Sequence, residues 1–203
     1  MSNKRCTLTT SMPKTPSSSP SPLLKDMTTK TAPMSVAGSR NFIHSHSIGH
    51  GVNEHWMSLA LAQADLAASE GEVPVGCVIV DAAGRAVGVS HNARETLADP
   101  TAHAELIAIR EAAGELRSWR LEGATAYVTL EPCAMCAGAF VLARVERVVY
   151  GCRDAKSGAI DSMFGIGRDA RLNHRFEVVS GILAEECAQR LRTFFGTLRG
   201  AKP

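Results

Sequence analysis

The sequence lacks several features that would place it in a special class of protein. No uninterrupted apolar stretch in its 203 residues approaches the roughly 20 residues of a membrane-spanning helix, which excludes such a span. No internal repeat is visible, which excludes a fibrous repeat. No charge of one sign dominates, since the formal net charge is only +2, and this excludes a uniformly basic nucleic-acid binder. The composition, 45% hydrophobic and 21% charged, is ordinary for a soluble globular protein.

Disulfide bonds are also not expected, although the chain has six cysteines. Cys133 and Cys136 lie too close together in sequence for an ordinary disulfide framework. A chain of this length also buries enough surface to fold without disulfide bonds. No signal peptide with an apolar centre precedes the folded part. Together these observations predict a protein of a reducing compartment, the cytoplasm.

Residues 1–50 differ in composition from the rest of the chain. They are dense in Ser, Thr and Pro between Thr7 and Pro33 and have almost no periodic apolar pattern. Such a segment cannot bury enough apolar surface to offset the entropy lost on ordering. We therefore expect a disordered leader over residues 1–50, followed by one folded domain over residues 51–199. A transit peptide, or a start upstream of the true first residue, are the alternative interpretations of this leader.

The apolar pattern after residue 50 predicts four helices and five strands. Asn53 is expected to cap the first helix, and Asp99 followed by Pro100 to start the second. The third helix is expected over residues 131–143 and the last over residues 183–198. Strands are expected at residues 75–80, 85–90, 124–130, 147–151 and 176–179. Because strands and helices alternate, we predict an α/β fold, with a mixed sheet covered by helices on both faces.

Three residues with metal-binding side chains stand out in the folded part. Cys133 and Cys136 lie three positions apart at the start of a predicted helix, so both sulfur atoms project from one face. The positive end of the helix favours the thiolate form that a metal requires. His103 lies at the start of another predicted helix, and its imidazole completes a set of three ligands. Three protein ligands leave the fourth tetrahedral position open for water, which is typical of catalytic zinc.

Glu105 is not needed as a ligand and can reach the same water, so its expected role is to shuttle protons. Zinc would lower the pKa of that water towards about 7. Separately, each motif has a simpler interpretation: Cys-x-x-Cys also occurs in redox pairs and structural zinc sites, and His-x-Glu is usually just part of a helix. A structural zinc site would require a fourth ligand, and the remaining candidates have no regular spacing to the first three: His91, Cys152, His174 and Cys187.

In combination, these motifs resemble a known family. His-x-Glu followed by Pro-Cys-x-x-Cys is the pattern of zinc-dependent nucleobase deaminases. From about residue 54 to residue 198 the chain is similar to the bacterial tRNA-specific adenosine deaminases, within the cytidine-deaminase-like superfamily. The resemblance rests on GEVPVG at 71–76, DPTAHAE at 99–105, LEPCAMCAGA at 130–139, YGCRDAKSGA at 150–159, LNHR at 172–175 and GILAEEC at 181–187.

The resemblance implies a three-layer α/β/α cytidine-deaminase-like fold with a five-stranded mixed sheet. It implies hydrolytic deamination of adenosine to inosine at the wobble position of a tRNA anticodon. It also implies one Zn²⁺ ion per subunit, held by His103, Cys133 and Cys136. The implied partners are the tRNA anticodon arm and a second copy of the chain in a homodimer. An anticodon loop presents unstacked bases, so the target base can enter a pocket at modest cost.

The same resemblance assigns three residues to substrate binding. Asn92 corresponds to a base-contacting Asn at the end of the second strand, where an amide can both donate and accept hydrogen bonds. Asp154 and Lys156 match an Arg-Asp-x-Lys segment near the flipped nucleotide. Without the resemblance, Asn92 would be interpreted as a turn residue and the other two as part of a solvated loop.

The C-terminal third of the chain is basic. Residues 144–203 contain eleven Lys and Arg against seven Asp and Glu, which offers a local phosphate-binding face. For any single arginine, a solvated surface position is the simpler interpretation. The candidates for phosphate contacts are Arg153, Arg171, Arg175, Arg190 and Arg192.

Two other functions stay open from the sequence alone. A deaminase of a free base or nucleoside, such as guanine or cytosine, would keep the zinc site without needing a basic C-terminal third. A non-enzymatic zinc module that binds RNA would need no proton shuttle, so the presence of Glu105 argues against it.

Overall fold

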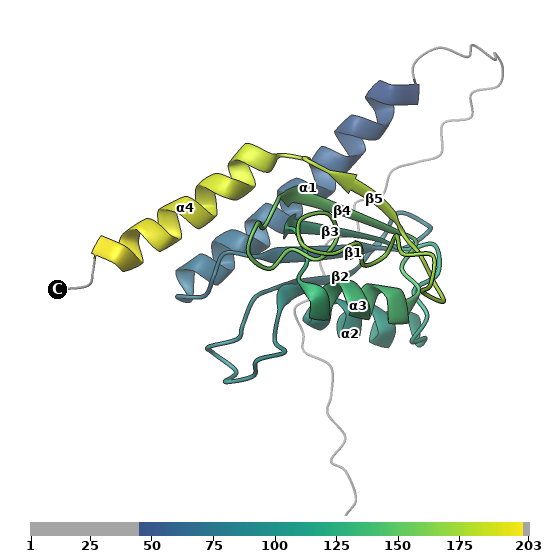
Figure 1. The fold of residues 1–203 in the computed structure, drawn as a ribbon, viewed down its shortest axis with the longest axis horizontal. Helices are drawn as coiled ribbons and strands as arrows, with labels where there is room; N and C mark the ends of the chain where they lie inside the picture. The colour runs from purple at the N-terminus through teal and green to yellow at the C-terminus, as the bar shows by residue number, and fades with distance from the viewer. Residues whose placement is uncertain (1–44, 201–203) are drawn as a thin grey trace, which may run out of the picture. The chain divides into compact units, whose positions relative to one another are not determined.

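A five-stranded mixed sheet lies at the centre of the residues that the structure, a computed structural model, describes: 45–200 (Figure 1). The strands are β1 (Gly76–Val80), β2 (Ala86–His91), β3 (Thr125–Leu130), β4 (Arg147–Cys152) and β5 (Glu177–Ser180). They are ordered β2-β1-β3-β4-β5, with β1 antiparallel to β2 and β3, and with β4 parallel to β3 and β5. This sheet confirms the one expected from the sequence.

The strand directions gather several chain segments at one edge of the sheet. Because β1 runs antiparallel to both of its neighbours, β2 and β3 point the same way, and β4 points the same way as β3. The segments that follow β2, β3 and β4 therefore leave the sheet at the same edge. The carboxyl ends of parallel strands are the usual place for ligand sites in α/β proteins.

Helices cover both faces of the sheet (Figure 1). α1 (Ser45–Ser69) and α4 (Ala184–Gly200) pack on one face, and α2 (Ala104–Leu116) and α3 (Ala134–Ala143) pack on the other. Successive side chains of a strand point to opposite faces, so Val78 belongs to the apolar cluster beneath α1, and Ile79 to the one beneath α2. This arrangement confirms the three-layer α/β/α fold. Among the described residues, no helix has the length and apolar character required to cross a membrane.

The second helix begins later than the sequence pattern predicted. The prediction that Asp99 and Pro100 start this helix is wrong, because α2 begins at Ala104 with His103 as its N-cap residue. Asp99 instead closes a local turn: its carboxylate accepts hydrogen bonds from the backbone N–H and the hydroxyl of Thr101, both at 2.7 Å. His103 therefore lies at the very start of the helix.

Two other helix starts also differ from the prediction. α1 begins at Ser45, before the expected cap Asn53, whose side chain instead accepts a hydrogen bond from the Tyr127 hydroxyl at 3.1 Å. α3 begins at Ala134 and not at residue 131, because the backbone N–H of Glu131 still pairs with the carbonyl of Cys152. Of the leader predicted over residues 1–50, residues 45–50 belong to α1, and residues 1–44 lie outside the described residues.

We expect a Gly88→Ala substitution in β2 to lower the free energy of unfolding by about 2–3 kcal/mol. A Cβ atom at this position would lie 2.3 Å from the carbonyl oxygen of Ala108, so α2 packs backbone to backbone against β2. Urea unfolding of the variant and the wild type measures the change.

Gly114→Ala in α2 is the matched control. No atom lies within 4 Å of the added Cβ, and Ala is favoured over Gly in a helix, so this variant should gain about 0.5–1 kcal/mol. If both variants lose the same free energy of unfolding, the close packing at Gly88 does not explain the loss in Gly88→Ala.

Candidate metal centre and substrate cavity

Three metal-binding side chains converge at the carboxyl edge of the sheet. Nδ1 of His103 lies 3.8 Å from Sγ of Cys133 and 3.6 Å from Sγ of Cys136. The three ligand atoms all lie within 4.8 Å of one another, which is compatible with binding a single ion. His103 and Cys133 are the N-cap residues of α2 and α3, and Cys136 lies in the first turn of α3. The structure thus brings together the three residues that the sequence singled out.

The donor set has the chemistry that zinc requires. The pKa of Cys133 is lowered to about 4, chiefly because the Cys136 thiol donates a hydrogen bond to its sulfur. This shared proton raises the pKa of Cys136, and the hydrogen bond with Cys133 raises the pKa of His103. A dication replaces protons held among such donors, and two thiolates with one imidazole are common zinc ligands. The residues therefore fit a zinc ion with one coordination position left for water.

Glu105 is enclosed beside this donor set. It lies in the first turn of α2, two residues after His103, and is only 4% exposed. Burial raises the pKa of its carboxyl group, because the charged form loses hydration. Its side chain lines the same cavity as His103 and Cys133. A carboxyl group in this position can take up and release a proton at a bound molecule, as a general acid–base group must.

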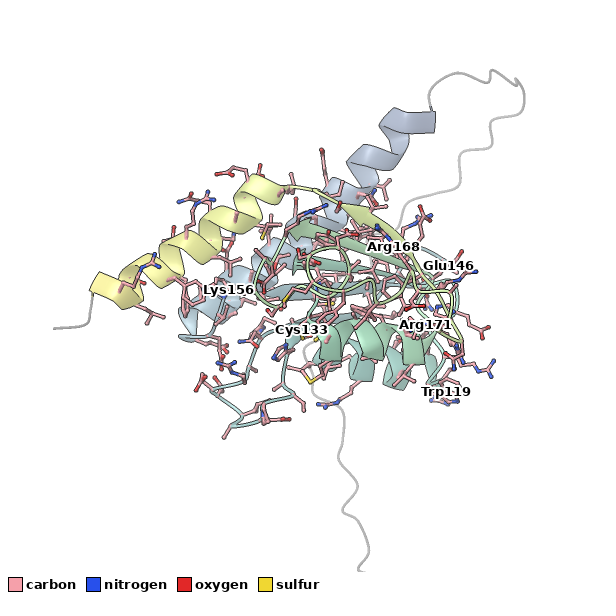
Figure 2. The ribbon with its side chains drawn as sticks, in the orientation of Figure 1. Trp119, Cys133, Glu146, Lys156, Arg168 and Arg171 are labelled. Carbon is pink, nitrogen blue, oxygen red and sulfur yellow. The ribbon has the colours of Figure 1, made fainter. Side chains whose placement is uncertain are left out.

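A cavity of about 510 Å³ opens over the metal donors. Its walls come from the segments that precede β1, from those that follow β2, β3 and β4, and from α4. Its volume lies within the range of small-molecule sites. In Figure 2, Cys133 and Lys156 lie on the same side of the molecule, at the cavity. The predicted site residues that line the cavity are Asn92, His103, Glu105, Cys133, Asp154 and Lys156.

The orientation of Asn92 is set by a buried carboxylate. Nδ2 of Asn92 donates a hydrogen bond of 2.9 Å to Oε2 of Glu72, which is 1% exposed. Oε1 of Glu72 accepts a second hydrogen bond, from the backbone N–H of Thr96 at 2.7 Å. In this pair Nδ2 of Asn92 is the donor and a carboxylate oxygen is the acceptor, so the amide nitrogen of Asn92 faces Glu72. The amide group is thereby fixed in one orientation at the cavity wall.

Asp154 and Lys156 lie on the loop that follows β4. Oδ1 of Asp154 accepts hydrogen bonds from the backbone N–H groups of Lys156 and Ser157 at 2.9 and 3.2 Å, and Oδ2 accepts one from the Ser157 hydroxyl. Burial alone would raise the pKa of Asp154, but these hydrogen bonds outweigh it and lower the pKa. The carboxylate therefore shapes the loop, while the Lys156 side chain is exposed at the cavity.

Comparison with known proteins identifies the family. The family model described as the cytidine and deoxycytidylate deaminase zinc-binding region matches residues 51–152. The tRNA-specific adenosine deaminases of Haemophilus influenzae and Bacillus subtilis are each 49% identical to this chain over 150 residues. These alignments cover 74% of this chain, and 87% and 92% of the two relatives, respectively. The chain belongs to the tRNA-specific adenosine deaminase family.

A solved structure supports the same assignment. It comes from work on A-to-I editing by tRNA:A34 deaminases at the wobble position of transfer RNA. It is 44% identical to this chain with a TM-score of 0.65, and the match covers 68% of this chain and 99% of that one. As a member of this family, the chain is a zinc-dependent deaminase, and the zinc cofactor expected from the sequence is confirmed.

The deaminase site also contains residues that sequence reasoning missed. Glu72 and Glu131 are buried acids that accept hydrogen bonds: Glu72 binds Asn92, and Glu131 lines the cavity, as does Phe195 of α4. Both acids lie within segments quoted for the family resemblance, directly beside the motif residues. A buried acid next to a motif is the signal that could have identified them, because acidic side chains are rarely buried without hydrogen-bond partners.

The candidate phosphate-binding arginines of this deaminase fall into two groups. Arg153 lines the cavity, and Arg192 lines an adjoining groove with Lys156. Arg192 also pairs with Glu185, and Arg190 pairs with Asp65. Figure 2 places Arg171 at the opposite end of the sheet from Cys133, where it pairs with Asp169. Arg175 is exposed in the segment that follows, so Arg153 and Arg192 are the two best placed at the cavity.

Proposed function

We propose that this chain hydrolytically deaminates adenosine to inosine at the wobble position of a tRNA anticodon. The observation that carries the proposal is one cavity in which the buried carboxyl group of Glu105 borders the donors His103 and Cys133, with Cys136 behind them. The relatives' names and the described activity of the related solved structure support adenosine in tRNA as the substrate.

We assign the zinc ion, one per subunit, to His103, Cys133 and Cys136. Zinc bound there would lower the pKa of a bound water molecule enough for that water to act as a nucleophile near neutral pH. The hydrolysis is balanced by one water: its oxygen forms a bond to C6 of adenine, the bond from C6 to the exocyclic nitrogen breaks, and ammonia leaves. Glu105 would accept one proton from the attacking water and pass it to the ring nitrogen N1. It would then take the second proton from the new hydroxyl group on C6 and pass it to the departing amine, so that C6 keeps the oxygen as a carbonyl.

Three further residues are assigned to substrate binding. Asn92 presents its fixed amide to the base, while Asp154 shapes the loop that carries Lys156 to the cavity. The ammonium group of Lys156 offers a charge for a phosphate of the RNA backbone. The bases of an anticodon loop are already unstacked, so one of them can turn outward into a cavity at low cost. The cavity here is large enough for one nucleoside.

The purified chain is expected to form inosine on an anticodon stem-loop that carries adenosine at the wobble base. A matched stem-loop with its adenosine one position away should react at least about 100-fold more slowly, because the reacting atom is then misplaced. Separation of nucleosides after digestion of the RNA measures both rates.

The competing activity on a free base is tested in the same preparation. Ammonia release from guanine or cytosine, with no inosine in RNA, would contradict the proposed substrate and leave only the zinc chemistry.

We also propose that the chain works in the cytoplasm, binds the anticodon arm and acts as a homodimer. The free state of the cysteines among the described residues, Cys77, Cys133, Cys136, Cys152 and Cys187, supports a reducing compartment. The family resemblance supports the homodimer, and sedimentation equilibrium of the purified chain distinguishes a dimer from a monomer.

A further inference from the structure

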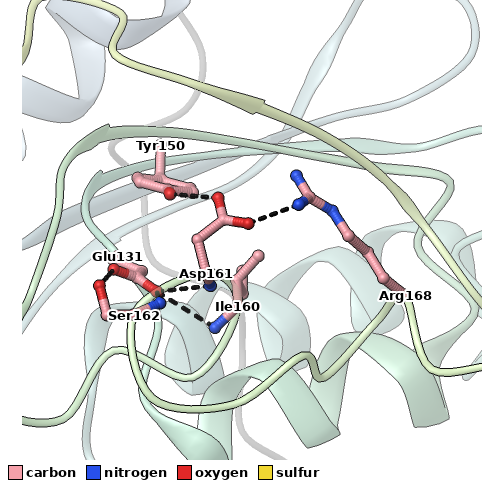
Figure 3. Close-up of polar contacts among 6 residues, drawn as sticks. All are labelled: Glu131, Tyr150, Ile160, Asp161, Ser162 and Arg168. Carbon is pink, nitrogen blue, oxygen red and sulfur yellow. Dashed lines mark hydrogen bonds and ion pairs between the residues drawn. The ribbon is translucent and has the colours of Figure 1, made fainter.

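The carboxylate of Glu131 binds both ends of the loop that follows β4. Figure 3 shows its contacts at the end of the loop, with residues 160–162. Oε2 accepts a hydrogen bond from the backbone N–H of Asp154 at 3.1 Å, at the start of the loop. Oε1 accepts hydrogen bonds from the backbone N–H groups of Ile160, Asp161 and Ser162 at 3.2, 2.8 and 2.8 Å, at its end. The Ser162 hydroxyl also donates to Oε2. Glu131 is 2% exposed, so these donors take the place of water.

The same loop is also hydrogen-bonded, through its backbone, to the segment that carries Cys133. The backbone N–H of Ala159 donates to the carbonyl of Pro132 at 2.9 Å, and Gly158 forms an isolated β-bridge with Cys133. A Cβ atom at Gly158 would lie only 2.4 Å from Cδ of Glu131, so the loop backbone packs directly on the carboxyl group. The loop, the carboxylate and one metal donor are therefore in close contact.

The two ends of the loop are held unequally. The carboxylate of Asp161 accepts hydrogen bonds from the Tyr150 hydroxyl and from the Arg168 guanidinium, both at 2.5 Å (Figure 3). The end of the loop is thus held by β4 as well as by Glu131. At the start of the loop, by contrast, the acceptor of the backbone N–H of Asp154 is Oε2 of Glu131. If Oε2 of Glu131 no longer accepted hydrogen bonds, the end of the loop would stay anchored through Asp161, whereas the backbone N–H of Asp154, at the start that lines the cavity, would lose its acceptor.

We propose that Glu131 is a positioning residue. It acts through the loop of residues 153–157 and keeps Lys156 at the cavity, in a fixed position relative to the proposed metal donors. The consequence for substrate binding rests on the proposed function. The structural part, that Glu131 orders the start of this loop, does not.

A Glu131→Gln substitution is expected to affect the start of the loop and its end differently. The amide oxygen can still accept hydrogen bonds from residues 160–162, but the amide nitrogen in place of Oε2 would face the N–H of Asp154, donor against donor. Hydrogen exchange at residues 153–158 is expected to become about tenfold faster, while residues 160–162 stay near the wild-type rate. KM for the anticodon stem-loop is expected to rise about tenfold, with zinc content unchanged and kcat within about threefold of wild type.

Two variants serve as controls. Glu122→Gln makes the same chemical change at an exposed side chain and should alter neither exchange nor KM. Ser162→Ala removes only the hydroxyl donor to Oε2 and leaves the N–H of Asp154 bound, so its effect on KM should stay below about threefold.

The outcomes separate this inference from the proposed function. Unchanged exchange at residues 153–158 in Glu131→Gln would overturn the inference, as would faster exchange with unchanged KM in an active enzyme. A fall in kcat that follows zinc content would assign Glu131 to the metal centre instead, and would also overturn it. If the wild type leaves the RNA unchanged, the proposed function fails, while hydrogen exchange still decides whether Glu131 orders the loop.

Discussion

Replacing Glu105 by Gln is expected to lower kcat for inosine formation by about 10³-fold, with zinc content unchanged. Gln has nearly the same volume as Glu but cannot accept a proton from water and release it to the base. Because Glu105 is only 4% exposed and burial raises its pKa, its charged form is destabilised where it stands. The Gln variant should therefore unfold at the same temperature as the wild type or a higher one. Single-turnover kinetics, metal analysis and thermal unfolding measure these three quantities.

Glu115→Gln is the matched control for this prediction. Glu115 is exposed near the end of the same helix, α2, so its replacement should leave kcat within about twofold of the wild type. If Glu105→Gln kept more than a tenth of the wild-type kcat at equal zinc content, another group would have to carry the proton. If the variant lost its zinc, the fall in kcat would not report on proton transfer at all, and the assigned role would have no support.

The sheet and the grouping of the proposed metal donors could be predicted from the sequence because their signals are local. Cys133 and Cys136 are separated by one helical turn, and this spacing alone places both sulfur atoms on one side of α3. The short apolar runs at residues 75–80 and 147–151 predicted strands, and the observed strands β1 and β4 are buried throughout or nearly so. In each case the residues that produce the pattern are the residues that make the structure.

The start of α2 could not be predicted in the same way. Asp followed by Pro is a common helix start, but the Asp99 carboxylate has a competing partner in Thr101, two residues along the chain. Sequence preference does not decide between the two arrangements, because each satisfies the carboxylate with backbone N–H groups. The later start places His103 at the N-cap, with its ring beside Cys133 and Cys136.

The supporting acids could not be predicted because their partners are distant in sequence. Glu72 contacts Asn92 across 20 residues, and Glu131 contacts Ser162 across 31 residues. No helical or strand periodicity links positions at such separations, and only the folded chain brings them together. The site therefore divides into donors that sequence spacing predicts and a hydrogen-bonded framework that it does not.

Replacing His103 by Ala is expected to weaken zinc binding by at least about 100-fold, since loss of even an outer-shell partner of a metal ligand typically costs 10–100-fold. Inosine formation should then fall below detection in metal-buffered solution. The fold should survive, because His103 lies at the edge of the sheet and belongs to neither of the two buried apolar clusters. Zinc titration, circular dichroism and the stem-loop assay, all with a thiol reductant present, measure the three effects.

His91→Ala is the control that separates this ligand from a neighbouring histidine. The ring nitrogens of His91 contact Gln63 and Glu70, so its loss should leave zinc affinity unchanged. Wild-type protein stripped by a chelator should behave like His103→Ala, but only the wild type should regain activity when zinc is added back. If His103→Ala retained zinc with wild-type affinity, the ion would have to be held by other residues. Glu105 would then lose its assigned partner, because it can activate water only where that water is bound.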